Sequence, residues 1–152
     1  MESIIKHYQV AHIGFSLSYP DYCQKVMDTL LGAYQGFECD EQVASAARTS
    51  FTLTLSESGE ELRKPAGFRE ECRQDEEGQL IISGSLGDTQ KAFLMAMTDM
   101  KSMLITDLDY QHSNLLVPAG VFSQKSAFGA IKSTIDTSLM LLYAMRSAGN
   151  DT

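Results

Sequence analysis

The sequence predicts an α+β fold, an antiparallel β-meander sheet with a short amino-terminal helix and a long buried carboxy-terminal helix. Three observations lead to this prediction. Short segments between residues 51 and 108 alternate apolar and polar side chains and are separated by turn residues, which is typical of antiparallel strands. An amphipathic stretch follows Pro20. Near the carboxyl end, residues 126–148 carry apolar side chains at three- and four-residue steps, the spacing of one side of a helix.

The first predicted strand, Tyr8–Tyr19, carries apolar side chains at alternate positions, which point to one face of a pleated strand. These residues are Ile13, Phe15, Leu17 and Tyr19. Pro20 ends the strand, and Asp21 offers an acceptor for the first turn of a helix over Tyr22–Tyr34. The inner side of this helix would carry Val26, Leu30 and Ala33. Residues 36–48 show no clear period, so we expect a connection there with a short extended piece at 37–39.

The middle of the chain is predicted to form a meander of strands and turns. The expected elements are a strand at Phe51–Leu55, an exposed charged loop at 57–67, strands at 68–74 and 79–86 joined by a turn at 75–78, a hairpin of Lys91–Met97 and Ser102–Leu108 around 98–101, and a loop at 109–123. Both hairpin strands are apolar on both faces, which is typical of the centre of a sheet. We therefore expect the terminal helix on one face of this hairpin and the first helix on the other.

The terminal helix, Ser126–Ala148, is the most apolar stretch of the chain. One side carries Phe128, Ile131, Ile135, Leu139 and Leu142, and this side is expected to face a core. Residues 139–145 contain no polar group apart from the Tyr143 hydroxyl, so this half of the helix is expected to be covered on most of its circumference. The candidate residues for an interdomain or dimer contact are Leu139, Leu142, Tyr143 and Met145.

The composition limits the classes of partner. The length of 152 residues suits a single domain, 1–152, able to bury roughly 70% of the surface of its unfolded chain. A formal charge of −8 repels phosphate backbones and anionic lipids, so neither nucleic acid nor a membrane is an expected partner. The three cysteines form no CxxC pair, and the amino terminus lacks the apolar run of a signal peptide. We therefore expect reduced thiols and a cytoplasmic location.

No motif in the sequence indicates catalysis, a cofactor or a metal. Ala119–Ser126 follows an apolar segment and precedes a helix, as a phosphate loop does, but it has Ala119 and Gln124 where the motif needs glycine. Ser83–Asp88 is better explained as a strand end and a turn. The three histidines are not grouped at metal-ligand spacing. We expect no catalytic residue, no cofactor and no metal site in this chain.

One pair of acidic residues leaves an alternative open. Asp107 and Asp109 are two positions apart, so both carboxylates would lie on one side of a strand end. That arrangement is compatible with an acid pair or a cation site, and equally with an ordinary edge or turn. A stand-alone enzyme would need this pair in a pocket with perturbed pKa values.

The end of the chain, Thr137–Thr152, with the amphipathic run before it, resembles the linking helix of serine kinases related to the HPr kinase/phosphorylase family. The opening segment HYQVAHIGFSLSY and the β-rich stretch after it also look like the amino-terminal domain of that family. The resemblance implies a chain that stops where an ATP-dependent kinase core would begin. That family binds nucleotide through a Walker-type loop, and no GxxxxGK[ST] occurs in these 152 residues. No catalytic residue can therefore be transferred to this chain.

Two functions are compatible with these observations. The first is a non-catalytic accessory or regulatory domain of an HPr-kinase-like serine kinase, which contacts the absent core or another protein. The second is a self-contained module that binds a small ligand or forms a homodimer, with the methionine-rich strands as its adaptable surface.

Overall fold

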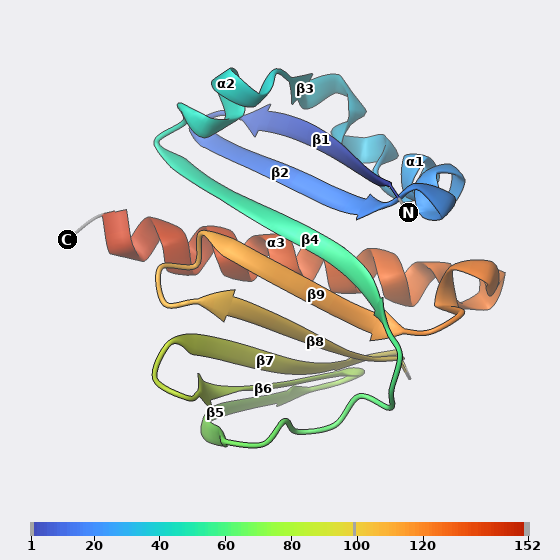
Figure 1. Cartoon of the computed structure of the whole chain (residues 1–152), viewed down its shortest axis with the longest axis vertical. Coiled ribbons are helices and arrows are strands. Elements are labelled where there is room, and N and C mark those ends of the chain that lie inside the picture. Colours follow the sequence, from blue (N-terminus) through green and yellow to red (C-terminus); the bar gives the residue numbers. More distant parts are fainter. Residues whose placement is uncertain (1, 99, 151–152) are drawn as a thin grey trace.

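The computed structural model describes residues 2–98 and 100–150, which form one sheet with helices beside it (Figure 1). The strands are β1 (Ser3–Val10), β2 (Ile13–Pro20), β3 (Glu38–Cys39), β4 (Thr49–Ser58), β5 (Phe68–Glu76), β6 (Gln79–Leu86), β7 (Gln90–Met97), β8 (Met100–Asp107) and β9 (His112–Pro118). The α-helices are α1 (Gln24–Leu30), α2 (Glu41–Ser45) and α3 (Phe128–Asn150). Single 3-10 turns or short 3-10 helices are η1 (Asp21–Cys23), η2 (Gly32–Phe37), η3 (Val121–Ser123) and η4 (Lys125–Ala127).

The sheet is mostly antiparallel and has the order β3-β1-β2-β4-β9-β8-β7-β6-β5. This confirms the predicted α+β class with a short helix near the amino terminus and a long carboxy-terminal helix on the sheet. The run from β5 to β8 is the predicted meander. The expectation of a loop over residues 109–123 is wrong, because His112–Pro118 form β9, which pairs with both β8 and β4. Two parallel pairs, β2 with β4 and β4 with β9, were not foreseen. Each follows a long excursion of the chain, and such crossovers are what allow parallel pairing.

The predicted first strand is wrong in its extent, because residues 8–19 do not form one strand. The chain folds into a hairpin of β1 and β2, and the turn between them contains Ala11 with a φ of 55°. Tyr8 pairs with Phe15 across this hairpin, and their rings stack with centroids 5.2 Å apart. The alternation predicted for Phe15 and its neighbours is correct on β2, whose inner side is buried.

The helices near the amino terminus also differ from the prediction. α1 ends at Leu30 and gives way to η2, so Ala33 is exposed while Met27 lies in the core. The helix α2 was missed, although the short extended piece before it is present as β3. α2 packs closely over β2, where a Cβ atom on Gly14 would overlap the carbonyl oxygen of Ala44.

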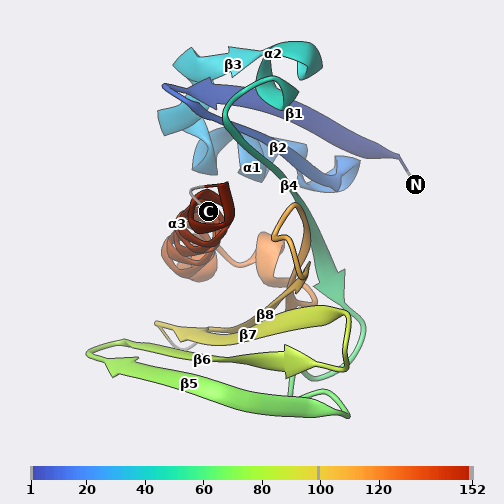
Figure 2. The ribbon, with the colours of Figure 1, turned by 90° about the vertical axis from the view of Figure 1, so that its left-hand side faces the viewer.

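The two faces of the sheet are covered in different ways. α1 and α3 lie on the same face, where their side chains join one core with the inner sides of β2, β4, β7 and β9 (Figure 2). The expectation that the first helix covers the opposite face of the β7–β8 hairpin is therefore wrong. That face is bordered by the segment Leu62–Lys64, which follows β4 and lines a cavity of about 190 Å³ with Leu80 and Leu94. A loop takes the place of the expected helix.

The predicted end of the terminal helix needs correction, and a few residues of predicted segments lie outside the described residues. The terminal α-helix was predicted over Ser126–Ala148, but it begins at Phe128 and continues to Asn150. Asp99, in the predicted β7–β8 turn, lies outside the described residues, as do Asp151 and Thr152 of the segment that carries the family resemblance. None of the helices in the described ranges combines the length and apolarity that crossing a bilayer requires.

Candidate functional site

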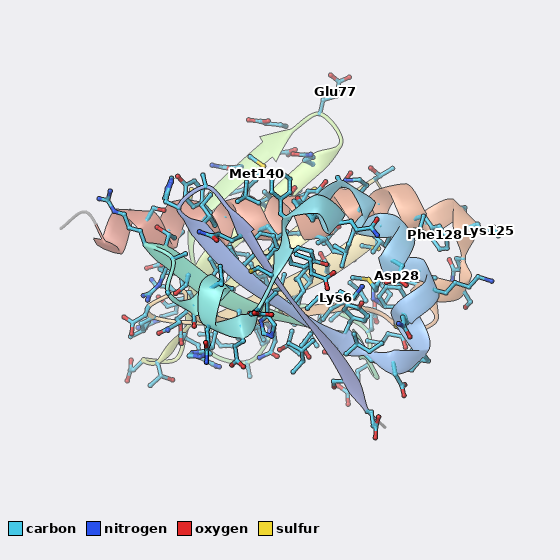
Figure 3. All side chains as sticks on the ribbon, turned by 90° about the horizontal axis from the view of Figure 1, so that it is seen from above. Lys6, Asp28, Glu77, Lys125, Phe128 and Met140 are labelled. Carbon is cyan, nitrogen blue, oxygen red and sulfur yellow. The ribbon has the colours of Figure 1, made fainter. Side chains whose placement is uncertain are left out.

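The side of α3 that faces away from the sheet is the strongest candidate for a functional surface. Ile131 and Leu142 on the inner side have no exposed surface, while Met140 is 71% exposed. Figure 3 shows Met140 on the side of α3 that points away from the sheet. Because the sheet buries the inner side of α3, the outward side is the part of the helix that another molecule can contact.

We call the outward-facing row of α3 the outer stripe. Its members are Ser133, Thr137, Met140, Ala144 and Ala148, which recur at helical spacing and are exposed or half-buried. None of these side chains is ionisable. At its border, Lys132 donates to Asp136 over 2.7 Å, so the nearest charges neutralise each other. The outer stripe is thus an uncharged surface on a chain with a formal charge of −8.

The structure divides the four contact residues predicted from the sequence. Leu139 and Leu142 face the core of their own chain. Tyr143 is half-buried, with its hydroxyl 3.2 Å from Nε2 of His12. Met145 is 39% exposed and is the most accessible of the four. The side predicted to face a core does so, because Ile131, Ile135, Leu139 and Leu142 are buried. The expectation that residues 139–145 are covered on most of the circumference is wrong, since Met140 is 71% exposed, and sequence reasoning missed Met140 for this reason.

A groove runs beside the outer stripe, between α3 and the outer strands of the sheet. It has a volume of about 290 Å³, and its apolar walls include Ile81, Phe93, Tyr110, Leu141 and Met145. Lys91 and Glu71 are polar residues of the groove lining. Nζ of Lys91 donates a hydrogen bond to the Glu71 carboxylate over 2.8 Å and another to the Ser85 hydroxyl over 3.2 Å. Leu141 lies between the outer stripe and the groove. The groove therefore adds an apolar surface to the uncharged outer stripe, in the direction of β6 and β7.

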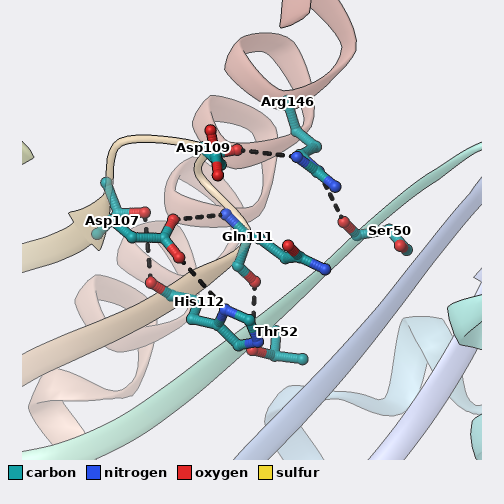
Figure 4. Close-up of polar contacts among 8 residues, drawn as sticks. Ser50, Thr52, Asp107, Asp109, Gln111, His112 and Arg146 are labelled. Carbon is teal, nitrogen blue, oxygen red and sulfur yellow. Dashed lines mark hydrogen bonds and ion pairs between the residues drawn. The ribbon is translucent and has the colours of Figure 1, made fainter. Parts of the chain in front are cut away.

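Asp107 is the last residue of β8, and Asp109 lies in the connection between β8 and β9 (Figure 4). The Asp107 carboxylate accepts the backbone N–H of Gln111 over 2.9 Å and lies 3.2 Å from Nδ1 of His112. Partial burial raises the pKa of Asp107, but the bonds from Gln111 and His112 outweigh it and hold the pKa below its usual value. Such a carboxylate is ionised at neutral pH, which is the wrong state for a general acid.

Asp109 takes part in this cluster through its backbone. Its carbonyl oxygen accepts a bond from Nη1 of Arg146 over 3.2 Å, and Nε of the same guanidinium donates to the carbonyl of Ser50 over 3.1 Å (Figure 4). Arg146 therefore fastens the last turns of α3 to β4 and to the β8–β9 connection. The cluster is a structural clamp, and the acid-pair alternative has no geometric support.

The other chemistry-bearing candidates have structural roles as well. The backbone N–H of Gly120, in the segment compared with a phosphate loop, donates to Glu57 over 2.8 Å, and the Tyr22 hydroxyl donates to the same carboxylate. A negative charge there disfavours a phosphate. Burial raises the pKa of the Cys23 thiol to about 11, so it is a poor nucleophile. Within residues 2–98 and 100–150, no three His, Cys, Asp or Glu side chains come together as metal ligands.

No protein-family model, curated protein or solved structure matches the chain. The resemblance to the HPr kinase/phosphorylase family therefore stays a prediction, carried by the residues quoted for it and by nothing else.

Proposed function

We propose that the chain is a non-catalytic accessory domain that works by contacting another protein body through the outer stripe of α3. The observation that carries this proposal is Met140, 71% exposed in the middle of an uncharged helical surface. Burying apolar surface of this kind contributes about 25 cal/mol per Å² removed from water. Exposed apolar patches on otherwise charged domains commonly mark protein contacts.

The family resemblance names one partner for this surface, the kinase core that the chain lacks. In that arrangement the ATP-dependent step belongs to the core, and this domain contributes interdomain packing, regulation or substrate presentation. The alternative is a self-contained dimerisation or ligand-binding module, which the groove beside the outer stripe favours, because its apolar walls would take a side chain of a bound partner. Both versions use the same face of α3.

The proposed setting is the cytoplasm. Cys23, Cys39 and Cys72 are unpaired thiols, as is usual in a reducing compartment. The formal charge of −8 makes a protein surface a more favourable partner than a nucleic acid or an anionic membrane.

The proposal is tested by site-specific photocrosslinking in the source cells. A photoreactive phenylalanine analogue replaces Met140 in one variant and Val43 in a matched control. Val43 suits the control because it is also an exposed apolar residue but lies on a different helix, α2. We expect a discrete protein crosslink from position 140 and a much weaker one from position 43, with the partner identified by mass spectrometry. Equal or absent crosslinking at the two positions would overturn the proposed function.

A further inference from the structure

We propose that a polar cavity between β1, β3, α1 and η2 binds a small α-amino acid such as glycine or alanine. The cavity has a volume of about 190 Å³ and is lined by Lys6, Tyr8, Asp28, Leu31, Gln35 and Glu38. It shares no residue with the outer stripe, so this inference is independent of the proposed function.

The first observation is the hydroxyl of Tyr8. This residue is only 1% exposed, its ring stacks on that of Phe15, and its hydroxyl has no hydrogen-bond partner among the described residues. Burial raises the pKa of Tyr8 to about 12, so the hydroxyl is protonated at neutral pH and can donate. Buried polar groups nearly always have a partner. Because Tyr8 lines the cavity, a molecule bound there can supply the missing partner.

A second buried hydroxyl lies close to the same charged groups. Tyr19 on β2 is 1% exposed, and its hydroxyl also lacks a partner within the described part of the chain. Burial raises the pKa of Tyr19, while Lys6 lowers it and Asp28 and Glu38 raise it further. The protein thus leaves two buried hydroxyls without a partner near the charges that line the cavity, as expected where a bound molecule completes the hydrogen bonding.

The second observation is the charge around Tyr8. Glu38 is paired with Tyr8 across β1 and β3, and Lys6 lies two positions before Tyr8, on the same face of β1. Nζ of Lys6 donates to Oδ1 of Asp28 over 3.1 Å, and Figure 3 shows these two side chains next to each other. Lys6 lowers the pKa of Tyr8 and Glu38 raises it, so charges of both signs lie near the hydroxyl.

This lining favours a zwitterion over an ion of one sign. Two carboxylates and one ammonium group give the cavity a net negative charge, which disfavours an anion on a chain with a formal charge of −8. A simple cation would be repelled by Lys6 and would leave the Tyr8 hydroxyl without an acceptor. An α-amino acid meets both demands, because its carboxylate can accept from Tyr8 and Lys6 while its ammonium group donates to Glu38.

The size of the cavity limits the side chain of the ligand. Its volume of about 190 Å³ far exceeds the roughly 10–15 Å³ that one water molecule needs. It is below the roughly 300 Å³ at which sites for drug-sized ligands begin. We therefore expect glycine, alanine or serine to fit better than leucine or phenylalanine.

Binding is tested by titrating the full chain with glycine, alanine and serine at neutral pH and following ¹H–¹⁵N chemical shifts. We expect saturable shifts around Lys6, Tyr8 and Glu38. Acetate and methylamine each carry one of the two charges and should bind at least about tenfold more weakly. No saturable shift with any of these amino acids at tens of millimolar would overturn the proposal. Equal binding of acetate or methylamine would overturn the assignment of a zwitterion.

Variants place the ligand in the cavity. Tyr8→Phe keeps the stacked ring and removes the hydroxyl, so it should weaken binding about tenfold or more. Tyr22→Phe is the matched control, because the Tyr22 hydroxyl donates to Glu57 outside the cavity, and its affinity should be unchanged. Glu38→Gln changes an exposed side chain and should reduce the preference for glycine over acetate. With folding checked by circular dichroism, unchanged binding in Tyr8→Phe or Glu38→Gln would overturn this site.

Discussion

The inner and outer sides of α3 look alike in sequence but have different surroundings. Leu142, on the inner side, is fully buried in the core, whereas Met140, two positions earlier, is 71% exposed. Both residues are large and apolar. The difference shows that apolar character along a helix does not by itself separate residues that hold the fold from residues that remain available to a partner. The following predictions test that separation, from the largest expected effect to the smallest.

Leu142→Ala should cause the largest loss of stability. The substitution removes a side chain that has no exposed surface and leaves a cavity between α3 and the sheet. We expect the free energy of unfolding to fall by about 2–5 kcal/mol. Urea denaturation followed by circular dichroism measures this change. A loss as small as that of an exposed residue would show that the core does not depend on the inner side of α3.

Arg146→Met tests the clamp at the end of α3. Its guanidinium donates to the carbonyls of Ser50 and Asp109, and methionine keeps part of the apolar contact while removing both bonds. We expect a loss of about 1–2 kcal/mol in the free energy of unfolding. Amide hydrogen exchange should rise in the last turns of α3 and stay unchanged near Ile131. Faster exchange along the whole helix would contradict a local clamp.

Asp107→Asn should have a smaller, pH-dependent effect. Because hydrogen bonds hold the folded-state pKa of Asp107 below its ordinary value of 3.8, the ionised carboxylate stabilises the fold above that pH. This contribution is lost as the pH falls through the folded-state pKa. The group is partly exposed, so we expect at most about 1 kcal/mol between the two proteins at pH 7.

The pH series that checks this prediction compares unfolding of the two proteins between pH 2 and 8. The difference should be constant from about pH 5 to 8 and shrink below about pH 3.8, as expected for a lowered carboxyl pKa. If the difference in the free energy of unfolding between the two proteins grew as the pH fell, the folded-state pKa of Asp107 would be raised, and the assigned direction would be wrong.

Met140→Ala should have the smallest effect on the isolated fold. The side chain makes few contacts within its own chain, so we expect a change within about 0.5 kcal/mol when unfolding is measured at concentrations where the chain is monomeric. A loss comparable to that of Leu142→Ala under monomeric conditions would mean that the outer stripe belongs to the core.

The sequence predicted β4 to β8 and the terminal helix well, because their signals are local. It missed β9, whose apolar run of Leu115, Leu116 and Val117 is short and is followed by Pro118 and Gly120, which are typical of a loop. The alternation in β4 and β6 survives in the fold, and the turn before β6 has Gly78 with a φ of 77°, a conformation that glycine adopts without strain. The β1–β2 turn escaped prediction because Ala11 and His12 carry no ordinary turn signal. Pairing and stacking of Tyr8 with Phe15 across the hairpin stabilise that turn instead.

The role of the terminal helix as a contact element stays a prediction. Of the four residues named for it, Met145 is accessible and two face the core. The spacing of Ile131, Ile135, Leu139 and Leu142 indicated the inner side correctly, but the apolar character of 139–145 hid the fact that Met140 is exposed. The acid pair also could not be judged from spacing, because Asp109 contributes a backbone carbonyl to the clamp.

By itself, the sequence determined the class of this fold, the order of most elements and the absence of known catalytic motifs from these 152 residues, because alternation, turn residues and motif spacing are local properties. The tertiary structure decided which strands pair in parallel, that α1 and α3 share one face, and that no other element covers Met140 on the outward side of α3. These features depend on how distant segments compete to cover the same apolar surface, and no local pattern encodes the result of that competition.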